Sequence, residues 1–308
     1  MTRLEILCLG IVAAYVALRL ARRDERAIDV LVRFALLSLS SAVAEDTIIH
    51  AYGYYGYATT WSVFVDRVPL VVVVVWPVVV DSAAVLARAL GGDRAPTPLR
   101  LAALTSVIVL GDAALIEPVA VRAGLWRWTE PGIFAVPVIG ILGWAVFAFF
   151  ATWILETRAR PAVLVVAPAA SHVVLVGAWW AGLRYLERPL PSLGVVLVVV
   201  LVSLLLVART TFDPRARGVP MRALLMRAPG ASFFFVLLAS DFAAPASFAA
   251  PWAAAWSPPP PGGGLLAAYV AAFAAPYLAA TARSARTART ARAGGEGAVD
   301  EGASEGRA

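Results

Sequence analysis

The chain has 308 residues, of which 61% are hydrophobic and only 15% are charged, and its mean hydropathy is +0.80. Soluble domains have roughly 25% charged residues, so this composition excludes an ordinary soluble fold and indicates a chain that faces membrane lipid. The net charge of +6 comes from arginines in connections and in one tail, a distribution that suits lipid headgroups and argues against a nucleic-acid partner.

Nine apolar segments approach the length of about 20 residues that a helix needs to cross a bilayer. The first seven are clear, whereas Asp241 and two prolines break the eighth and Pro276 interrupts the ninth. We therefore predict an all-α fold, a polytopic transmembrane helical bundle of about seven to nine spans. The segments are 4–20, 28–49, 69–89, 99–116, 133–155, 162–183, 190–208, 231–250 and 264–280.

The arginines also predict the orientation, because Lys and Arg accumulate in cytoplasmic loops. The odd-numbered connections and the tail hold more of them than the even-numbered connections do. The N-terminus is therefore predicted outside and the C-terminus in the cytoplasm, for a protein of the bacterial inner membrane. Residues 1–281 form the predicted transmembrane domain, and 282–308, with Thr-Ala-Arg repeats followed by Gly and Glu, form a disordered cytoplasmic tail.

The sequence lacks the residues that several kinds of site require. One cysteine, Cys8, rules out an internal disulfide and a multi-cysteine metal site. With two histidines and no nucleotide-binding or HExxH motif, we predict neither a metal nor a cofactor. Acid–base chemistry by carboxylates, or binding and transport, remain.

Ionisable side chains inside spans are costly and are therefore candidates for function. Glu45, Asp46 and His50 lie near the outer end of the second segment, and Asp112 and Glu117 near the outer end of the fourth. Asp46 and His50 share a helix face, as a functional pair or as an interfacial one. Asp112 and Glu117 are separated by about 140° around a helix, and the following proline is predicted to end that helix.

Two further polar residues lie within spans. Asp81 in the third segment and His172 in the sixth are predicted to pair with other side chains inside the bundle. Aromatic residues are dense after the second and fourth segments. They favour an interfacial belt over a pocket that stacks on a polyene or stabilises a carbocation. They are Tyr52, Tyr54, Tyr55, Tyr57, Trp61, Trp126 and Trp128.

Residues 111–144 read GDAALIEPVAVRAGLWRWTEPGIFAVPVIGILGW. This stretch resembles the carotenoid biosynthesis family of membrane proteins that includes the gamma-carotene and bisanhydrobacterioruberin hydratases. The matching positions are Asp112, Pro118, Val119, Ala120, Gly124, Trp126, Trp128, Gly132, Val136, Pro137, Gly143 and Trp144. Glu117 stands where the family usually has Asp, Ile133 and Phe134 replace a Tyr pair, Ala135 replaces Gly, and Gly140 stands where Asn is usual.

A second block, around the second and third segments, supports the resemblance. It consists of Glu45, Gly53, Gly56, Tyr57, Val68-Pro69-Leu70 and Trp76. The two blocks fit the family in order and spacing over about a third of the chain, within a family-like core of about 28–208.

The resemblance implies hydration of the terminal double bond of a linear carotenoid of the lycopene or gamma-carotene type. A carboxylic acid would protonate the alkene, and a second carboxylate would activate water, without a cofactor. Other enzymes of the pathway are expected partners. The acid and base candidates are Asp112 and Glu45, followed by Glu117 and Asp46, and the substrate-binding candidates are Trp126, Trp128, Tyr57, His50 and Trp144.

Two alternatives stay open. The same cation could be captured by an internal double bond, which would make the protein a carotenoid cyclase or another isoprenoid-modifying enzyme. A non-enzymatic carotenoid- or isoprenoid-binding membrane protein, or a transporter, would use its carboxylates only as helix–helix partners.

Overall fold

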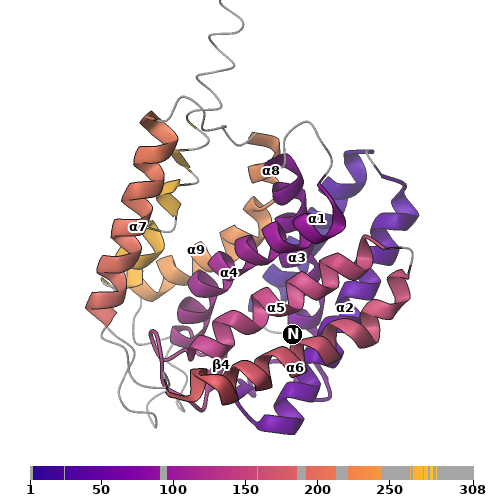
Figure 1. Cartoon of the computed structure of the whole chain (residues 1–308), viewed down its shortest axis with the longest axis horizontal. Helices are drawn as coiled ribbons and strands as arrows, with labels where there is room; N and C mark the ends of the chain where they lie inside the picture. The colour runs from indigo at the N-terminus through magenta and orange to yellow at the C-terminus, as the bar shows by residue number, and fades with distance from the viewer. Residues whose placement is uncertain are drawn as a thin grey trace, which may run out of the picture.

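The computed structural model describes residues 3–23, 25–90, 96–157, 159–185, 192–212, 221–243, 264, 266–272, 274–276, 278–279 and 282. These residues are mostly helical, which confirms the predicted all-α class (Figure 1). The helices are α1 (Arg3–Ala21), α2 (Ala27–Tyr52), α3 (Leu70–Leu90), α4 (Pro98–Arg122), α5 (Val138–Leu155), α6 (Val163–Ala181), α7 (Ser192–Phe212), α8 (Met221–Leu225) and α9 (Ala228–Ala243), with short 3-10 turns at Arg160–Ala162 and Leu183–Tyr185.

Six of the described helices are long and apolar enough to cross a membrane: α1 to α5, and α6 together with the turn before it. Shorter apolar stretches at Leu193–Arg209 and Leu266–Pro276 coincide with the predicted seventh and ninth segments. The eighth predicted segment, 231–250, corresponds to α9, and its part beyond residue 243 lies outside the described residues. Residues 283–308 of the predicted tail also lie outside the described residues.

Five helices form a closed ring in which α2 packs on α3, α3 on α4, α4 on α5, α5 on α6, and α6 on α2. Helix α1 packs outside this ring against α3 and α9, and α9 also contacts α4. Figure 1 shows α5 and α6 side by side and α7 at one edge of the molecule. The ring brings together side chains from segments that are far apart in the sequence.

Local signals explain where two of these helices begin and end. The Thr97 side chain accepts a hydrogen bond from the backbone N–H of Arg100 and caps α4, whose first residue is Pro98. Helix α2 ends at Gly53, whose left-handed φ of 61° suits glycine. The prediction that Pro118 ends the fourth helix was wrong, because α4 continues through this proline to Arg122.

Four short strands lie in the connections at one end of the ring. Strand β1 (Tyr55–Tyr57) pairs antiparallel with β4 (Trp126–Trp128), and β2 (Phe64–Val65) pairs with β3 (Val68–Pro69). The β1–β4 pair joins the connection after α2 to the connection after α4. Sequence patterns did not predict these strands, which are only two or three residues long.

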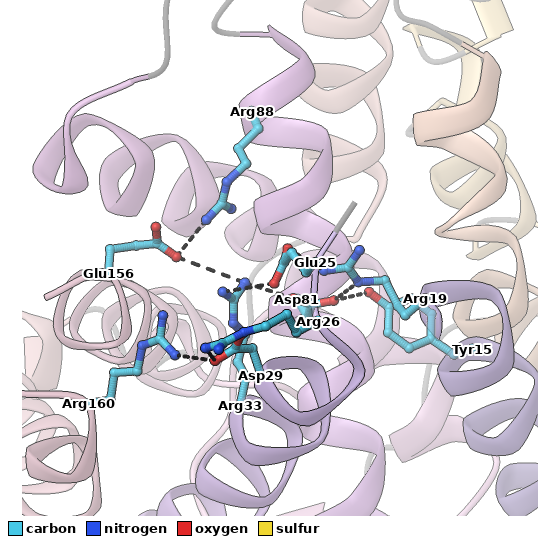
Figure 2. Close-up of polar contacts among 10 residues, drawn as sticks. All are labelled: Tyr15, Arg19, Glu25, Arg26, Asp29, Arg33, Asp81, Arg88, Glu156 and Arg160. Atoms are coloured by element: carbon cyan, nitrogen blue, oxygen red, sulfur yellow. Dashed lines mark hydrogen bonds and ion pairs between the residues drawn. The ribbon is translucent and has the colours of Figure 1, made fainter. Parts of the chain in front are cut away.

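A buried ionic network ties α1 and α2 to α3 (Figure 2). Asp81 accepts hydrogen bonds from the Tyr15 hydroxyl at 2.5 Å and from Arg19 Nε at 2.8 Å, and Arg33 Nη1 lies 3.6 Å from its other oxygen. Glu25 bridges Arg19 and Arg33 at 2.8 and 3.2 Å. The Asp81 and Arg19 side chains are 7% and 2% exposed, which confirms the prediction that Asp81 pairs inside the bundle.

The Asp81 network generates a stability prediction. Asp81→Asn removes the carboxylate that pairs with Arg19 Nε, while Glu25 still contacts Arg19 Nη2, and loss of one partner of a buried pair typically costs up to about 3–5 kcal/mol. We expect a clearly lower thermal unfolding temperature for this variant in detergent, followed by tryptophan fluorescence. Arg26→Gln is the control, because Arg26 pairs with Asp29 at the surface and is 81% exposed. Equal unfolding temperatures for Asp81→Asn and the unchanged protein would contradict this role.

Candidate functional site

Two glutamates line one cavity inside the helix ring. Glu45 comes from α2 and is 9% exposed, and Glu117 comes from α4 and is 2% exposed. The empty space between the lining side chains, including its open mouth, is about 1350 Å³. Apart from these carboxyl groups and their partners the lining is largely apolar, and it includes Ile48, Val72, Val75, Ile139, Gly140, Gly143, Phe147, Leu175 and Phe233. We call this space the glutamate cavity.

Three indole groups surround the Glu117 carboxyl group. Trp126 Nε1 and Trp128 Nε1 donate to Oε2 at 2.7 and 2.8 Å, and Trp144 Nε1 donates to Oε1 at 2.7 Å. An indole N–H only donates hydrogen bonds. All three groups can therefore donate to an ionised carboxylate, but none can accept a hydrogen bond from the protonated carboxylic acid. The three donors therefore compensate for much of the hydration that Glu117 loses on burial.

The Glu45 carboxyl group has a different set of partners. The hydroxyls of Tyr55 and Tyr57 both donate to Oε2, the latter at 2.9 Å, and Trp76 Nε1 donates to Oε1 at 2.8 Å. A phenol can accept a hydrogen bond as well as donate one. Glu45 thus has partners that suit both its protonated and its ionised form, in contrast to Glu117.

Burial beside Glu45 also determines the protonation state of the Tyr55 and Tyr57 phenols. Loss of hydration, together with the nearby carboxylate, raises the pKa of Tyr55 and Tyr57 well above the usual value for tyrosine. Both side chains therefore stay protonated at physiological pH. They remain available as hydrogen-bond donors to Glu45.

The β1–β4 pair positions the partners of both glutamates together. Tyr55 lies opposite Trp128, and Tyr57 lies opposite Trp126. Alternate residues of a strand point to the same face, so these four side chains project from one side of the sheet. Their rings contact across the strands, with centroids 4.6 Å apart for Tyr55 and Trp128 and 5.9 Å apart for Tyr57 and Trp126.

The predicted aromatic belt was wrong for these residues. Tyr55, Trp126 and Trp128 are each 8% exposed, and with Tyr57 they line the glutamate cavity. Trp144 lines it as well, so four of the five predicted substrate-binding side chains are found there. Tyr55 and Trp76 were not among the predicted site residues, although the spacing Tyr-x-Tyr beside Trp-x-Trp is a signal that two facing strands would explain.

Asp46 and His50 lie outside the glutamate cavity, near the protein surface. His50 Nε2 is 2.7 Å from Asp66 Oδ2 and 3.7 Å from Asp46 Oδ2. One imidazole and two carboxylates at these distances could hold a divalent cation. The His50 and Asp66 side chains are 42% and 62% exposed, and ion pairs of this kind are also common at surfaces without a metal.

Asp112 is not brought into the glutamate cavity either. It pairs with Arg227, which lies between α8 and α9, and it lines a second cavity. The angular separation of Asp112 and Glu117 on α4 accounts for this arrangement. His172 forms hydrogen bonds with Thr47 at 2.8 Å and with Tyr52 at 2.9 Å, as predicted for a contact between helices, and it lies in the lining of the glutamate cavity.

The fold and the cavity define a polytopic helical membrane protein with two buried carboxyl groups in an aromatic, largely apolar site. A family model described as "Carotenoid biosynthesis protein" matches residues 2–210. This match covers more than half of the chain, so the protein belongs to this carotenoid biosynthesis family, as its sequence motifs indicated. The match also includes α1, which lies before the expected core of 28–208. No curated protein and no solved structure matches the chain.

The structure shows the local geometry at two residues that depart from the family motif. Ala135, which stands where the family has Gly, has a φ of 67°, a value that favours glycine. Gly140 stands where Asn is usual, and a Cβ atom there would lie 2.6 Å from Cζ2 of Trp128. The missing side chain at Gly140 leaves the space that the Trp128 ring occupies.

Gly140 generates a second prediction. In Gly140→Ala the new methyl group displaces the Trp128 ring and weakens its hydrogen bond to Glu117, so we expect altered tryptophan fluorescence. Gly143→Ala is a matched control one turn further along α5, where the nearest contact would be an ordinary 3.6 Å to Leu175 Cδ1. Indistinguishable fluorescence spectra for the two variants would contradict this position of the Trp128 ring.

Proposed function

We propose that the protein is a cofactor-independent carotenoid hydratase that adds water to the terminal double bond of a linear carotenoid end group. Its role in carotenoid biosynthesis follows from family membership. The observation that carries the finer proposal is the pair of buried glutamates in one apolar cavity, each with three hydrogen-bond donors. A lycopene- or gamma-carotene-type chain is the proposed substrate, in the bacterial inner membrane.

Hydration of an isolated alkene needs a strong acid, a stabilised cation and a base that activates water. We assign the acid to Glu45, because its phenol neighbours can accept a hydrogen bond from its protonated form. We assign the base to Glu117, because three donor-only indoles favour a carboxylate. The sequence-based expectation placed Asp112 and Glu45 first and Glu117 and Asp46 next, whereas this assignment pairs Glu45 with Glu117 and gives Asp112 and Asp46 no direct contact with the substrate.

The proposed reaction has two steps. The Glu45 O–H bond breaks and its proton forms a C–H bond at the less substituted alkene carbon, which leaves a tertiary cation on the neighbouring carbon. A water oxygen then forms the C–O bond, and Glu117 takes a proton from that water. The substrate gains one water in total, and return of the proton from Glu117 to Glu45 resets the site.

The cavity walls suit the proposed cation. The rings of Tyr57, Trp126 and Trp144 line the cavity around the two carboxyl groups. Aromatic faces carry negative charge density and attract cations, by about 2 kcal/mol or more where water is excluded. Preorganised carboxylate and ring electrostatics of this kind would lower the energy of the transition state that precedes the cation.

The decisive experiment is expression in bacteria that make lycopene or gamma-carotene, with pigments analysed by chromatography and mass spectrometry. The proposal expects a product one water heavier than the substrate with an unshortened chromophore. A product of unchanged mass would indicate cyclisation instead. Unaltered pigment bound to the purified protein would indicate binding or transport without chemistry.

Substitutions of the two glutamates test the assignment. General acid–base groups contribute roughly a hundredfold to ten-thousandfold, so Glu45→Gln and Glu117→Gln should each lower hydrate formation by about a hundredfold or more. Glu117→Asp is the matched control, because the family usually has Asp here and the acid is retained. Membrane levels of each variant are measured by immunoblot. Normal hydrate formation by Glu117→Gln would refute its role as base.

A further inference from the structure

A second cavity adjoins the glutamate cavity. Val75, Val79, Gly230 and Phe234 line both, so these residues lie at the boundary between the two spaces. The second cavity has an empty space of about 1140 Å³, including its open part, and lies between α3, α4 and α9. It is called here the aspartate cavity, after Asp112.

Polar groups distinguish the aspartate cavity from an ordinary packing gap. The paired side chains of Asp112 and Arg227 are 16% and 14% exposed, and Ser82 also contributes to the lining. A charged pair within the membrane region of a helix bundle is costly, and such pairs commonly line water-filled paths. The rest of the lining is mostly apolar, so Asp112, Arg227 and Ser82 are the groups that would hold water here, and a buried water typically makes about three hydrogen bonds.

The glutamate cavity, in contrast, has few polar groups besides its two carboxyl groups and their partners. Its two carboxyl groups are already engaged by six donors, and the remaining walls are mostly aliphatic and aromatic. Hydration nevertheless consumes one water per turnover, and that water cannot come from the hydrocarbon phase that supplies a carotenoid. A route apart from the space that the substrate fills would supply this water.

We propose that the aspartate cavity is this route, a site that binds water and passes it between Val75, Val79, Gly230 and Phe234 to the glutamate cavity. This inference rests on the proposed hydratase function. Asp112 acts as a positioning residue that holds water and Arg227, and it does not protonate the substrate. Arg227 lies beyond the family match to residues 2–210, so this partner is contributed by a segment outside the matched region.

Water access can be tested without any measurement of activity. In a Cys8→Ala background, which removes the only cysteine, Leu115→Cys places a thiol in the lining of the aspartate cavity. Val107→Cys is the matched control on the same helix, because Val107 is 67% exposed and is expected to face lipid. A thiol reacts as its thiolate, which forms where water is present. A charged, water-soluble thiol reagent should therefore label Leu115→Cys roughly tenfold or more faster than Val107→Cys. Equal labelling in membranes would overturn the proposal.

Deuterium incorporation tests the role of Asp112 in the reaction. In deuterated medium, a cation that forms but is not captured by water loses a proton and returns to an alkene that now contains deuterium. Asp112→Asn should therefore lower hydrate formation by up to roughly a hundredfold, as misplacement of a reactant does, while recovered substrate gains deuterium. Glu45→Gln should abolish both hydrate and deuterated substrate.

The outcomes separate this inference from the proposed function. Asp112→Asn with neither hydrate nor deuterium exchange would make Asp112 the catalytic acid and overturn the water route. Normal hydrate formation by this variant would overturn it as well. If the unchanged protein forms no hydrate yet Leu115→Cys is labelled selectively, the aqueous cavity stands and the hydratase proposal fails.

Discussion

Burial of the Glu117 carboxyl group under three indole N–H groups is the constraint on which the rest of the site depends. A buried carboxylate without partners is strongly unfavourable, so Trp126, Trp128 and Trp144 must all reach it at once. Two of these tryptophans come from β4 and the third from α5. Their convergence requires the turn between α4 and α5, the space beside Gly140 and the pairing of β4 with β1.

The membrane-spanning architecture could be predicted from the sequence because its cause is local. The predicted segment 133–155 is apolar except for Thr152, and its length then predicts a spanning helix, which the structure shows as α5. The helix end predicted at Pro118 was wrong, because a proline inside a helix removes one backbone hydrogen bond without necessarily ending the helix, and α4 continues past it for one more turn to Arg122. The eighth segment, which Asp241 and two prolines interrupt, was the weakest prediction of a span.

The candidate site could be predicted only in part. Glu45 and Glu117 stood out because charges inside spans are rare, but spacing along α4 did not reveal which of Asp112 and Glu117 faces the cavity. The roles of Tyr55 and Trp76 depend on contacts across the ring, from α2 and β1 to α3. Composition favoured a lipid-interface belt for aromatic residues that are buried around carboxyl groups, since both settings select the same amphipathic rings.

The two-stranded β1–β4 ribbon has a mechanical consequence. Tyr55 and Tyr57 contact Glu45, and the cross-strand neighbours Trp128 and Trp126 contact Glu117, so one short ribbon holds the partners of both acids. The relative placement of these two donor groups is therefore set by backbone hydrogen bonds between strands, which change little when helices tilt. A change in helix tilt with bilayer thickness would therefore move the glutamates and their helical donors Trp76 and Trp144, but not the spacing between the two donor pairs on the ribbon.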